Sequence, residues 1–171
     1  MSERTVWRTR PETGADTAAV HRVNVAAFDR PEEADLVDAL RRDPAWIPGL
    51  SWVAEDERGE VIGYTLLTRC KVGDGDALAL APVAVLPEYQ RRGVGDAVIR
   101  AALEAARDRG ERLVVVLGHP AYYPRFGFVR ASTMGIGVAF EVPDEALMAM
   151  RLDDGGPVPV GTVTYPAPFG V

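Results

Sequence analysis

The chain has 171 residues, 47% of them hydrophobic and 26% charged, which suits one domain that buries its own core without disulfides. A formal net charge of −6 argues against general nucleic-acid binding, because clustered Lys and Arg would be needed to neutralise phosphates. We therefore expect a single domain over residues 1–171, with 149–171 as a C-terminal extension packed on it.

The first part of the chain predicts a strand followed by two helices. Apolar and polar residues alternate over 5–9, which is typical of a strand. Asp16 is placed to cap a helix over 17–28, and Pro31 fits the first turn of a second helix. Leu36, Val37 and Leu40 predict the buried face of that second helix.

A hairpin and a third strand are predicted next. The segments 52–56 and 61–71 flank a turn at Arg58-Gly59, and a further glycine-rich turn leads into an apolar strand that ends near residue 86. Pro82 interrupts this strand. Because proline cannot donate a ladder hydrogen bond, it indicates a bulge or an edge position.

This strand runs into the segment 90–95, Gln-Arg-Arg-Gly-Val-Gly, which opens a helix. The first turn of a helix presents unpaired N–H groups and the positive end of the helix dipole, so it attracts anions. Gly93 and Gly95 allow a phosphate to approach the backbone closely. A P-loop is excluded because the chain has no Gly-Lys pair, and Val98 stands where a dinucleotide fingerprint needs its third glycine.

The helix after this turn and the strand that follows are strongly patterned. Ile99, Ala102, Leu103 and Ala106 share one helix face, and Gly110 is placed to end the helix. The continuous apolar run 113–117 then predicts a strand buried on both faces.

The remaining third of the chain predicts fewer elements. We expect a strand over 138–142 and a turn at 143–145, followed by the segment 147–152. Turn residues fill the beginning of the tail 153–171, which predicts an ordered extension with one late strand.

Two motifs in this order resemble the GNAT-type N-acetyltransferase superfamily. Residues 90–95 resemble its coenzyme A loop, Q/R-x-x-G-x-G, and residues 119–128 resemble its tyrosine-to-Gly-Phe segment. The resemblance extends over about residues 4–142. It implies an α/β (α+β mixed) fold whose mostly antiparallel central sheet has a V-shaped split between two adjacent parallel strands and is flanked by helices.

The resemblance also implies a binding site for acetyl-coenzyme A. The pantetheine arm would pair with free strand amides in the split, and a backbone N–H, that of Val85, would face the thioester oxygen. The implied cofactor-binding residues are Val83, Ala84, Val85, Gln90, Arg91, Arg92, Gly93, Val94, Gly95 and Asp96.

A tyrosine is the expected catalytic residue. In the family that the chain resembles, the general acid lies four residues before the glycine of the Gly-Phe pair, which corresponds here to Tyr123, and Tyr122 is the fallback. A purely packing role for both rings stays open. His119 and Pro120 stand where many family members carry an asparagine, so pantetheine contacts at that point stay open as well.

The implied activity is transfer of an acetyl group from acetyl-coenzyme A to a primary amine by direct attack. The acceptor is a small-molecule amine or a peptide amine, and a homodimer is compatible with the sequence. Five carboxylates are candidates for the general base without one being favoured: Asp29, Glu32, Glu33, Glu55 and Glu88. The alternative is a coenzyme A sensor that binds without turnover.

Several further expectations come from what the sequence lacks. Cys70 is the single cysteine, so no intrachain disulfide forms, and a buried thiol is favoured over a nucleophile. Two separated histidines offer no metal-ligand spacing. Without a bilayer-length apolar run or a signal-peptide core, the sequence predicts a cytoplasmic protein with no membrane partner.

Overall fold

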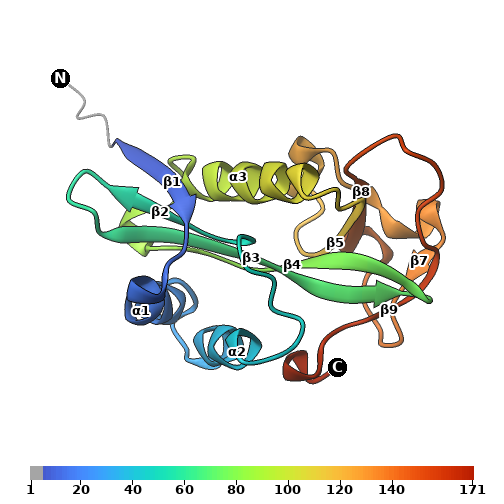
Figure 1. The fold of residues 1–171 in the computed structure, drawn as a ribbon, viewed down its shortest axis with the longest axis horizontal. Coiled ribbons are helices and arrows are strands. Elements are labelled where there is room, and N and C mark those ends of the chain that lie inside the picture. Colours follow the sequence, from blue (N-terminus) through green and yellow to red (C-terminus); the bar gives the residue numbers. More distant parts are fainter. Residues whose placement is uncertain (1–5) are drawn as a thin grey trace.

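A computed structural model describes residues 6–171 as one mixed sheet with helices on both faces (Figure 1). Neighbouring strands of the main path are antiparallel except β4 and β5, which are parallel. This arrangement confirms the expected fold class. Across the sheet, the strands follow the order β1 (Trp7–Pro11), β2 (Ser51–Asp56), β3 (Val61–Val72), β4 (Gly75–Val85), β5 (Leu113–Leu117), β8 (Leu147–Arg151) and β6 (Val129–Arg130).

Helix α3 (Val94–Asp108) covers one face of the sheet, and α1 (Thr17–Phe28) and α2 (Glu32–Arg41) lie on the other (Figure 1). The predicted apolar face of α3 is confirmed, because its four residues are buried against β4, β5 and β8. Gly110, with φ +83°, follows the end of this helix as predicted. No helix within residues 6–171 combines the length and apolar character needed to cross a bilayer.

The last part of the chain returns beneath the sheet. Strand β9 (Gly161–Thr164) pairs with the end of β3 and with the short strand β7 (Ile136–Gly137), which confirms the predicted late strand. The 3-10 helix η6 (Ala167–Phe169) then reaches α2 (Figure 1). The side chain of Phe169 packs on the core under α1 and α2. The C-terminal segment therefore connects the end of β3, where β9 pairs, with the helices α1 and α2.

Strands β4 and β5 separate soon after they meet. They pair only at Leu78–Val114 and Ala79–Val115, although β4 continues to Val85. The edge of β4 that faces β3 contains a bulge. Between the pairs Thr65–Val83 and Leu67–Leu80, β4 advances by three residues and β3 by two, and Pro82 lies in this stretch of β4. The predicted irregularity at Pro82 is confirmed, and beyond Ala79 the β5-facing edge of β4 has no strand partner among the described residues.

Two local predictions are wrong. Residues 138–142 do not form a strand, although Val138 and Val142 pack against the core beneath the sheet. An apolar pattern indicates which side chains face the core, and here a loop half-buries Val138 and Val142 without ladder pairing. Asp16 stands at the N-cap position of α1, but its side chain makes no capping hydrogen bond to the helix, because its carboxylate accepts the Thr13 N–H at 2.7 Å.

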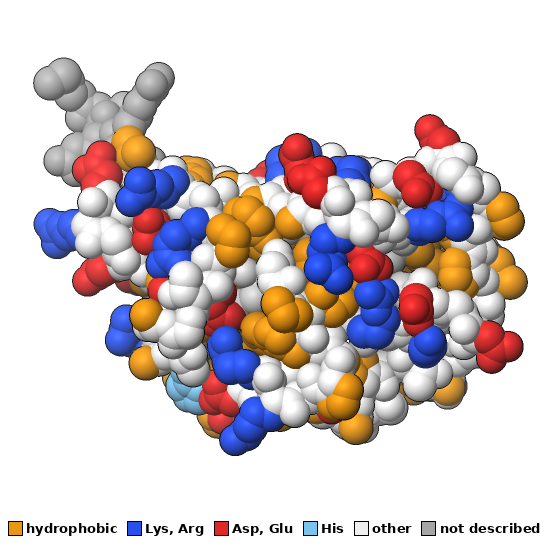
Figure 2. All heavy atoms as spheres, viewed as in Figure 1, with side chains coloured by type: hydrophobic (Ala, Val, Ile, Leu, Met, Phe, Trp, Pro, Cys, Tyr) orange, Lys and Arg blue, Asp and Glu red, His pale blue; other side chains and the backbone are white. Residues whose placement is uncertain are grey.

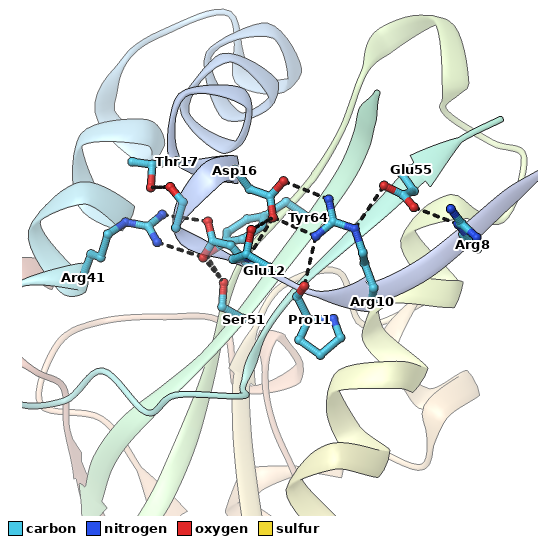
Figure 3. A network of polar contacts seen from close by, with 12 residues as sticks. Arg8, Arg10, Pro11, Glu12, Asp16, Thr17, Arg41, Ser51, Glu55 and Tyr64 are labelled. Carbon is cyan, nitrogen blue, oxygen red and sulfur yellow. Dashed lines mark hydrogen bonds and ion pairs between the residues drawn. The ribbon is translucent and has the colours of Figure 1, made fainter. Parts of the chain in front are cut away.

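Buried polar contacts join β1 to the helices on its face of the sheet (Figure 3). The Glu12 side chain is only 3% exposed and accepts two hydrogen bonds from Arg41, at 2.9 and 2.8 Å, and one from Ser51. Arg10 donates to Asp16 at 2.7 and 2.8 Å. Such bidentate pairs fix orientation as well as charge, so they hold α1 and α2 in register with the sheet.

Charges on the outside are mixed. On the face shown in Figure 2, basic and acidic side chains of the described residues alternate over the surface, and apolar patches lie between them. This distribution gives that face no continuous basic stripe of the kind that binds nucleic acid.

Candidate functional site

The free edge of β4 presents backbone N–H groups to the split. Leu86 N donates to Ile62 O at 2.9 Å, and Ala84, two residues earlier, is also paired with β3. Donors alternate in direction along an antiparallel strand. The amides of Val83 and Val85 consequently point away from β3, into the space between β4 and β5.

The glycine-rich turn leads directly into α3. Gly93 has φ +91°, in the left-handed region, and stands at the N-cap position. The first helical hydrogen bond runs from Ala97 N to Gly93 O at 3.0 Å. The amides of Val94, Gly95 and Asp96 therefore have no partner within the helix, which is the arrangement that binds anions.

The rest of the turn is fixed to β4 and carries positive charge. Gln90 Nε2 donates to Val85 O at 3.1 Å, so this side chain holds the turn against the strand. Arg91 takes φ +63°, and the Arg92 guanidinium lies 5.9 Å from the centroid of the Tyr89 ring. Both arginines are exposed beside the first turn of α3.

The Asp96 side chain binds protein groups. Its carboxylate accepts a hydrogen bond from the Tyr122 hydroxyl at 2.6 Å and lies 3.4 Å from an Arg125 nitrogen. The Arg125 guanidinium also lies 4.4 Å from the centre of the Tyr122 ring. Burial, and then the hydrogen bond to Asp96, raises the pKa of Tyr122. These contacts hold the tyrosine segment against the start of α3. Because they occupy the Asp96 carboxylate, the backbone N–H is the group of Asp96 that can bind an anion.

Tyr123 is packed at the end of β5. A Cβ added to Gly118 would lie 2.5 Å from Cε2 of the Tyr123 ring, so only glycine allows the ring to sit there. Edge-on contacts to Tyr122 and Phe128, with centroids 5.0 and 5.8 Å apart, hold the ring from other sides. Burial alone raises the pKa of Tyr123, so the hydroxyl keeps its proton at neutral pH.

A cavity of about 250 Å³ opens where β4 and β5 part. Leu80, Ala81 and residues 115–117 line it from the two strands. The aromatic side chains that close it could not be predicted from local sequence patterns, because their segments are distant in the chain. These aromatic residues are Phe140, Tyr165 and Phe169.

The predicted candidates for the general base do not meet at this cavity. Glu55 accepts hydrogen bonds from Arg10 and Arg8, which lower its pKa. Glu33 is paired with Arg30, which lowers its pKa as well. None of the cavity residues is one of the five predicted carboxylates, namely Asp29, Glu32, Glu33, Glu55 and Glu88.

The cysteine and the two histidines lie outside this cavity. Cys70 is buried, and burial raises the pKa of its thiol to about 12, as expected for a packing residue. His21 bonds Asp38 at 2.8 Å between α1 and α2, a partner that the sequence did not indicate. His119 is exposed and contributes its backbone oxygen to the turn at Tyr122.

Comparisons with known proteins agree with this geometry. The sequence model of the Acetyltransferase (GNAT) family matches residues 18–128. The uncharacterized N-acetyltransferase YjhQ of Escherichia coli (strain K12) is 40% identical over 136 residues, which cover 77% of this chain and 75% of that protein.

Two solved structures share the whole architecture. One is the GNAT family N-acetyltransferase YhbS of Escherichia coli in complex with CoA, with a TM-score of 0.90 and 28% identity over 100% of this chain and 96% of that chain. The other is a GNAT family acetyltransferase from Brucella melitensis in complex with acetyl-CoA, with a TM-score of 0.79 and 31% identity over 97% and 99% of the two chains. The family model, the relatives and the split sheet agree, and the chain belongs to the GNAT acetyltransferase family.

Proposed function

We propose that this protein binds acetyl-coenzyme A and transfers its acetyl group to a primary amine by direct attack on the thioester. The proposal rests on one observation. The unpaired edge of β4, with its Val83 and Val85 amides pointing into the split, leads to the N-terminus of α3, where the first amides have no partner within the helix. Such an edge suits the amide groups of pantetheine, and such a helix end suits a pyrophosphate. The CoA and acetyl-CoA held by the two solved relatives support the same ligand here.

The order of groups along β4 gives the cofactor a direction. With its pyrophosphate at the amides of residues 94–96 and beside Arg91 and Arg92, the pantetheine arm passes Val85 first and Val83 second. The thioester, at the far end of the arm, comes closest to Val83. We therefore assign to the Val83 N–H the oxyanion contact that the sequence analysis gave to Val85, whose N–H then serves the arm.

The chemistry needs a proton for the leaving sulfur. The amine nitrogen forms a bond to the thioester carbon, the carbon–sulfur bond breaks, and the thiolate takes a proton from the Tyr123 hydroxyl. The nitrogen loses its extra proton to solvent, and the Tyr123 phenolate takes a proton back from solvent, so that no net proton is gained or lost by the protein. Tyr123 suits this role because burial keeps it protonated, whereas the Tyr122 hydroxyl is bound to Asp96.

Thiol release in the presence of acetyl-coenzyme A and a mixed pool of amines tests the proposal, with calorimetry of cofactor binding in parallel. Amine-dependent release together with binding is the expected result. Binding without release for any amine would identify a coenzyme A sensor instead. A protein that shows neither binding nor release would contradict the cofactor site itself.

The C-terminal segment belongs to the proposed enzyme as well. We propose that residues 149–171 are part of the same domain, since β8 pairs with β5 and Phe169 packs on the core beneath α1 and α2. Tyr165 and Phe169 then complete the cavity at the reacting end of the split.

A further inference from the structure

The regular pairing of β3 with β4 is interrupted next to the amide that we assign to the oxyanion. The two strands pair at Thr65–Val83, and the next pair is Leu67–Leu80, with the bulge between them. Pro82 lies inside this break and has no N–H with which to join a ladder. The pairing that orients peptide planes along a strand is therefore broken at the residue before Val83.

A side chain of β3 bonds the backbone inside this break. The Thr65 hydroxyl donates to the carbonyl oxygen of Pro82 at 3.2 Å, and Thr65 is 0% exposed. Because the contact is shielded from water, it is stronger than an exposed hydrogen bond and its loss leaves a buried carbonyl without this donor. Thr65 thus holds β4 where the ladder is irregular.

The carbonyl that Thr65 holds belongs to the same peptide unit as the Val83 N–H. The bond between Pro82 and Val83 is trans, so its C=O and N–H lie in one plane and point in opposite directions. With the Pro82 oxygen held toward β3, the Val83 N–H points into the split. A hydrogen bond accepted by the carbonyl also polarises the amide and makes its N–H a stronger donor.

We propose that Thr65 is a positioning residue for acetyl transfer, whose hydroxyl fixes the Pro82–Val83 peptide plane so that the Val83 N–H meets the oxyanion. This inference rests on the proposed function, since it takes the thioester oxygen to lie at Val83. The Thr65 hydroxyl bonds the side of the peptide plane that faces β3, so it acts through the backbone. A preorganised donor stabilises charge that develops during the reaction, and its loss lowers kcat more than cofactor affinity.

The same strand offers a matched control. Thr68 is also 0% exposed, but its hydroxyl has no hydrogen-bond partner among residues 6–171. Thr65→Val and Thr68→Val each replace a buried hydroxyl by a methyl group, and only the first removes the bond to Pro82. A disturbed core would lower activity in both variants, whereas a misaligned peptide plane would lower it in Thr65→Val alone.

Steady-state kinetics with acetyl-coenzyme A and a competent amine provide the first test. We expect Thr65→Val to lower kcat about tenfold, less than the 10² to 10³ that removal of a whole oxyanion donor costs. KM for acetyl-coenzyme A should change less than kcat, Thr65→Ser should recover most of the loss, and Thr68→Val should keep the parental kcat. A parental kcat in Thr65→Val, or an equal loss in Thr68→Val, overturns the proposal.

Infrared spectroscopy of the complex with acetyl-coenzyme A provides a second test that requires no acceptor. With ¹³C at the thioester carbonyl, the frequency of the carbonyl band falls as its oxygen accepts a stronger hydrogen bond. We expect this band at higher frequency in Thr65→Val than in the parent protein and Thr68→Val, and at the parental frequency in Thr65→Ser. The same band position in all four proteins overturns the proposal.

A further variant covers the case in which Thr65→Val does not fold. Thr65→Cys keeps a side chain of similar size and replaces the hydroxyl by a thiol, which is a weaker donor. Its carbonyl band should also move to higher frequency, and an unshifted band overturns the proposal.

Failure of the proposed function gives a different result. Acetyl-coenzyme A that binds, shows the band shift in Thr65→Val and releases no thiol with any amine would support the positioning role and contradict the transfer. Transfer at the parental rate by Thr65→Val, with an unshifted band, would contradict the positioning role and leave the transfer intact. Acetyl-coenzyme A that does not bind the parent protein would contradict both.

Discussion

Tyr122 and Tyr123 are adjacent in the chain, but their hydroxyl groups lie in different surroundings. The Tyr122 hydroxyl is held 2.6 Å from an Asp96 oxygen, which makes it a structural link to α3. Tyr123 packs over Gly118, and burial is the only cause of its raised pKa. At the residue scale, this difference is the reason for proposing Tyr123, and not Tyr122, as the proton donor.

Replacing Tyr123 by Phe should lower kcat by about 10² or more, because general acid catalysis is typically worth about 10² to 10⁴. The affinity for acetyl-coenzyme A should stay within a few-fold, since the ring and its packing remain. Steady-state kinetics with a competent amine, together with calorimetry, measure both quantities. In the parent protein the alkaline loss of activity should lie above pH 10, because the pKa of Tyr123 is raised from 10.0.

Tyr122→Phe is the matched control. It removes the hydrogen bond to Asp96 and keeps the ring, so we expect KM for acetyl-coenzyme A to change more than kcat. A parental kcat in the Tyr123→Phe variant, measured where chemistry limits the rate, would rule out Tyr123 as the acid.

The ion pair between Arg10 and Asp16 should contribute to acid stability. The hydrogen bonds from Arg10 lower the pKa of Asp16 from 3.8 to about 2. A depressed folded-state pKa gives stability that is present above pH 3.8 and lost as the pH falls through 2, in total about 2 kcal/mol. Urea unfolding at several pH values should show this fall, and Asp16→Asn should remove it. An unchanged acid limb in the variant would assign the pH dependence to other carboxylates.

At the scale of elements, the N-terminus of α3 and the edge of β4 lie side by side and together form the proposed binding surface for coenzyme A. A Cβ added to Gly95 would lie 3.4 Å from the Tyr122 hydroxyl oxygen, 3.6 Å from Val85 Cγ2 and 4.0 Å from Val83 Cγ1. The glycine thus faces the side chains of the same two valines whose amides point into the split. Gly93 is a poorer site for a test, because with φ +91° any side chain strains the backbone before a ligand arrives.

Gly95→Ala should weaken coenzyme A binding at least tenfold while the Tm changes by less than about 2 °C. The methyl group has ordinary contacts in the free protein but narrows the space beside the first-turn amides. Calorimetry and thermal unfolding measure the two effects. Gly14→Ala is the control, since a Cβ there meets nothing within 4 Å. Parental affinity in folded Gly95→Ala would show that the phosphates bind elsewhere.

At the scale of the whole molecule, the cofactor should stabilise the fold, because its site joins α3 to both parallel strands. Coenzyme A at 100 times Kd should add about 2.7 kcal/mol to the free energy of unfolding. For a domain of this size we expect a rise in Tm of about 5 to 10 °C. Differential scanning fluorimetry measures the shift in Tm. Adenosine nucleotides that lack the pantetheine arm should raise the Tm by a smaller amount. No shift at millimolar coenzyme A would contradict the site.

The elements with strong local patterns were predictable from the sequence. The turn at Gly93 and Gly95, the buried face of α3 and the apolar strand β5 depend on residues close together in the chain, so periodicity and turn chemistry suffice. The same holds for the irregularity at Pro82. Residues 138–142 show the limit, since their apolar pattern predicted a strand where a loop half-buries Val138 and Val142.

The site itself depends on contacts between distant parts of the chain. The sequence determined a glycine-rich turn that opens a helix, a tyrosine segment and the family that they resemble. Only the tertiary structure decided that β4 and β5 separate after two pairs, that Tyr122 reaches Asp96, and that Phe140, Tyr165 and Phe169 meet at the split. Sheet order and the path of the C-terminal segment bring these groups together, and no local pattern specifies either of them.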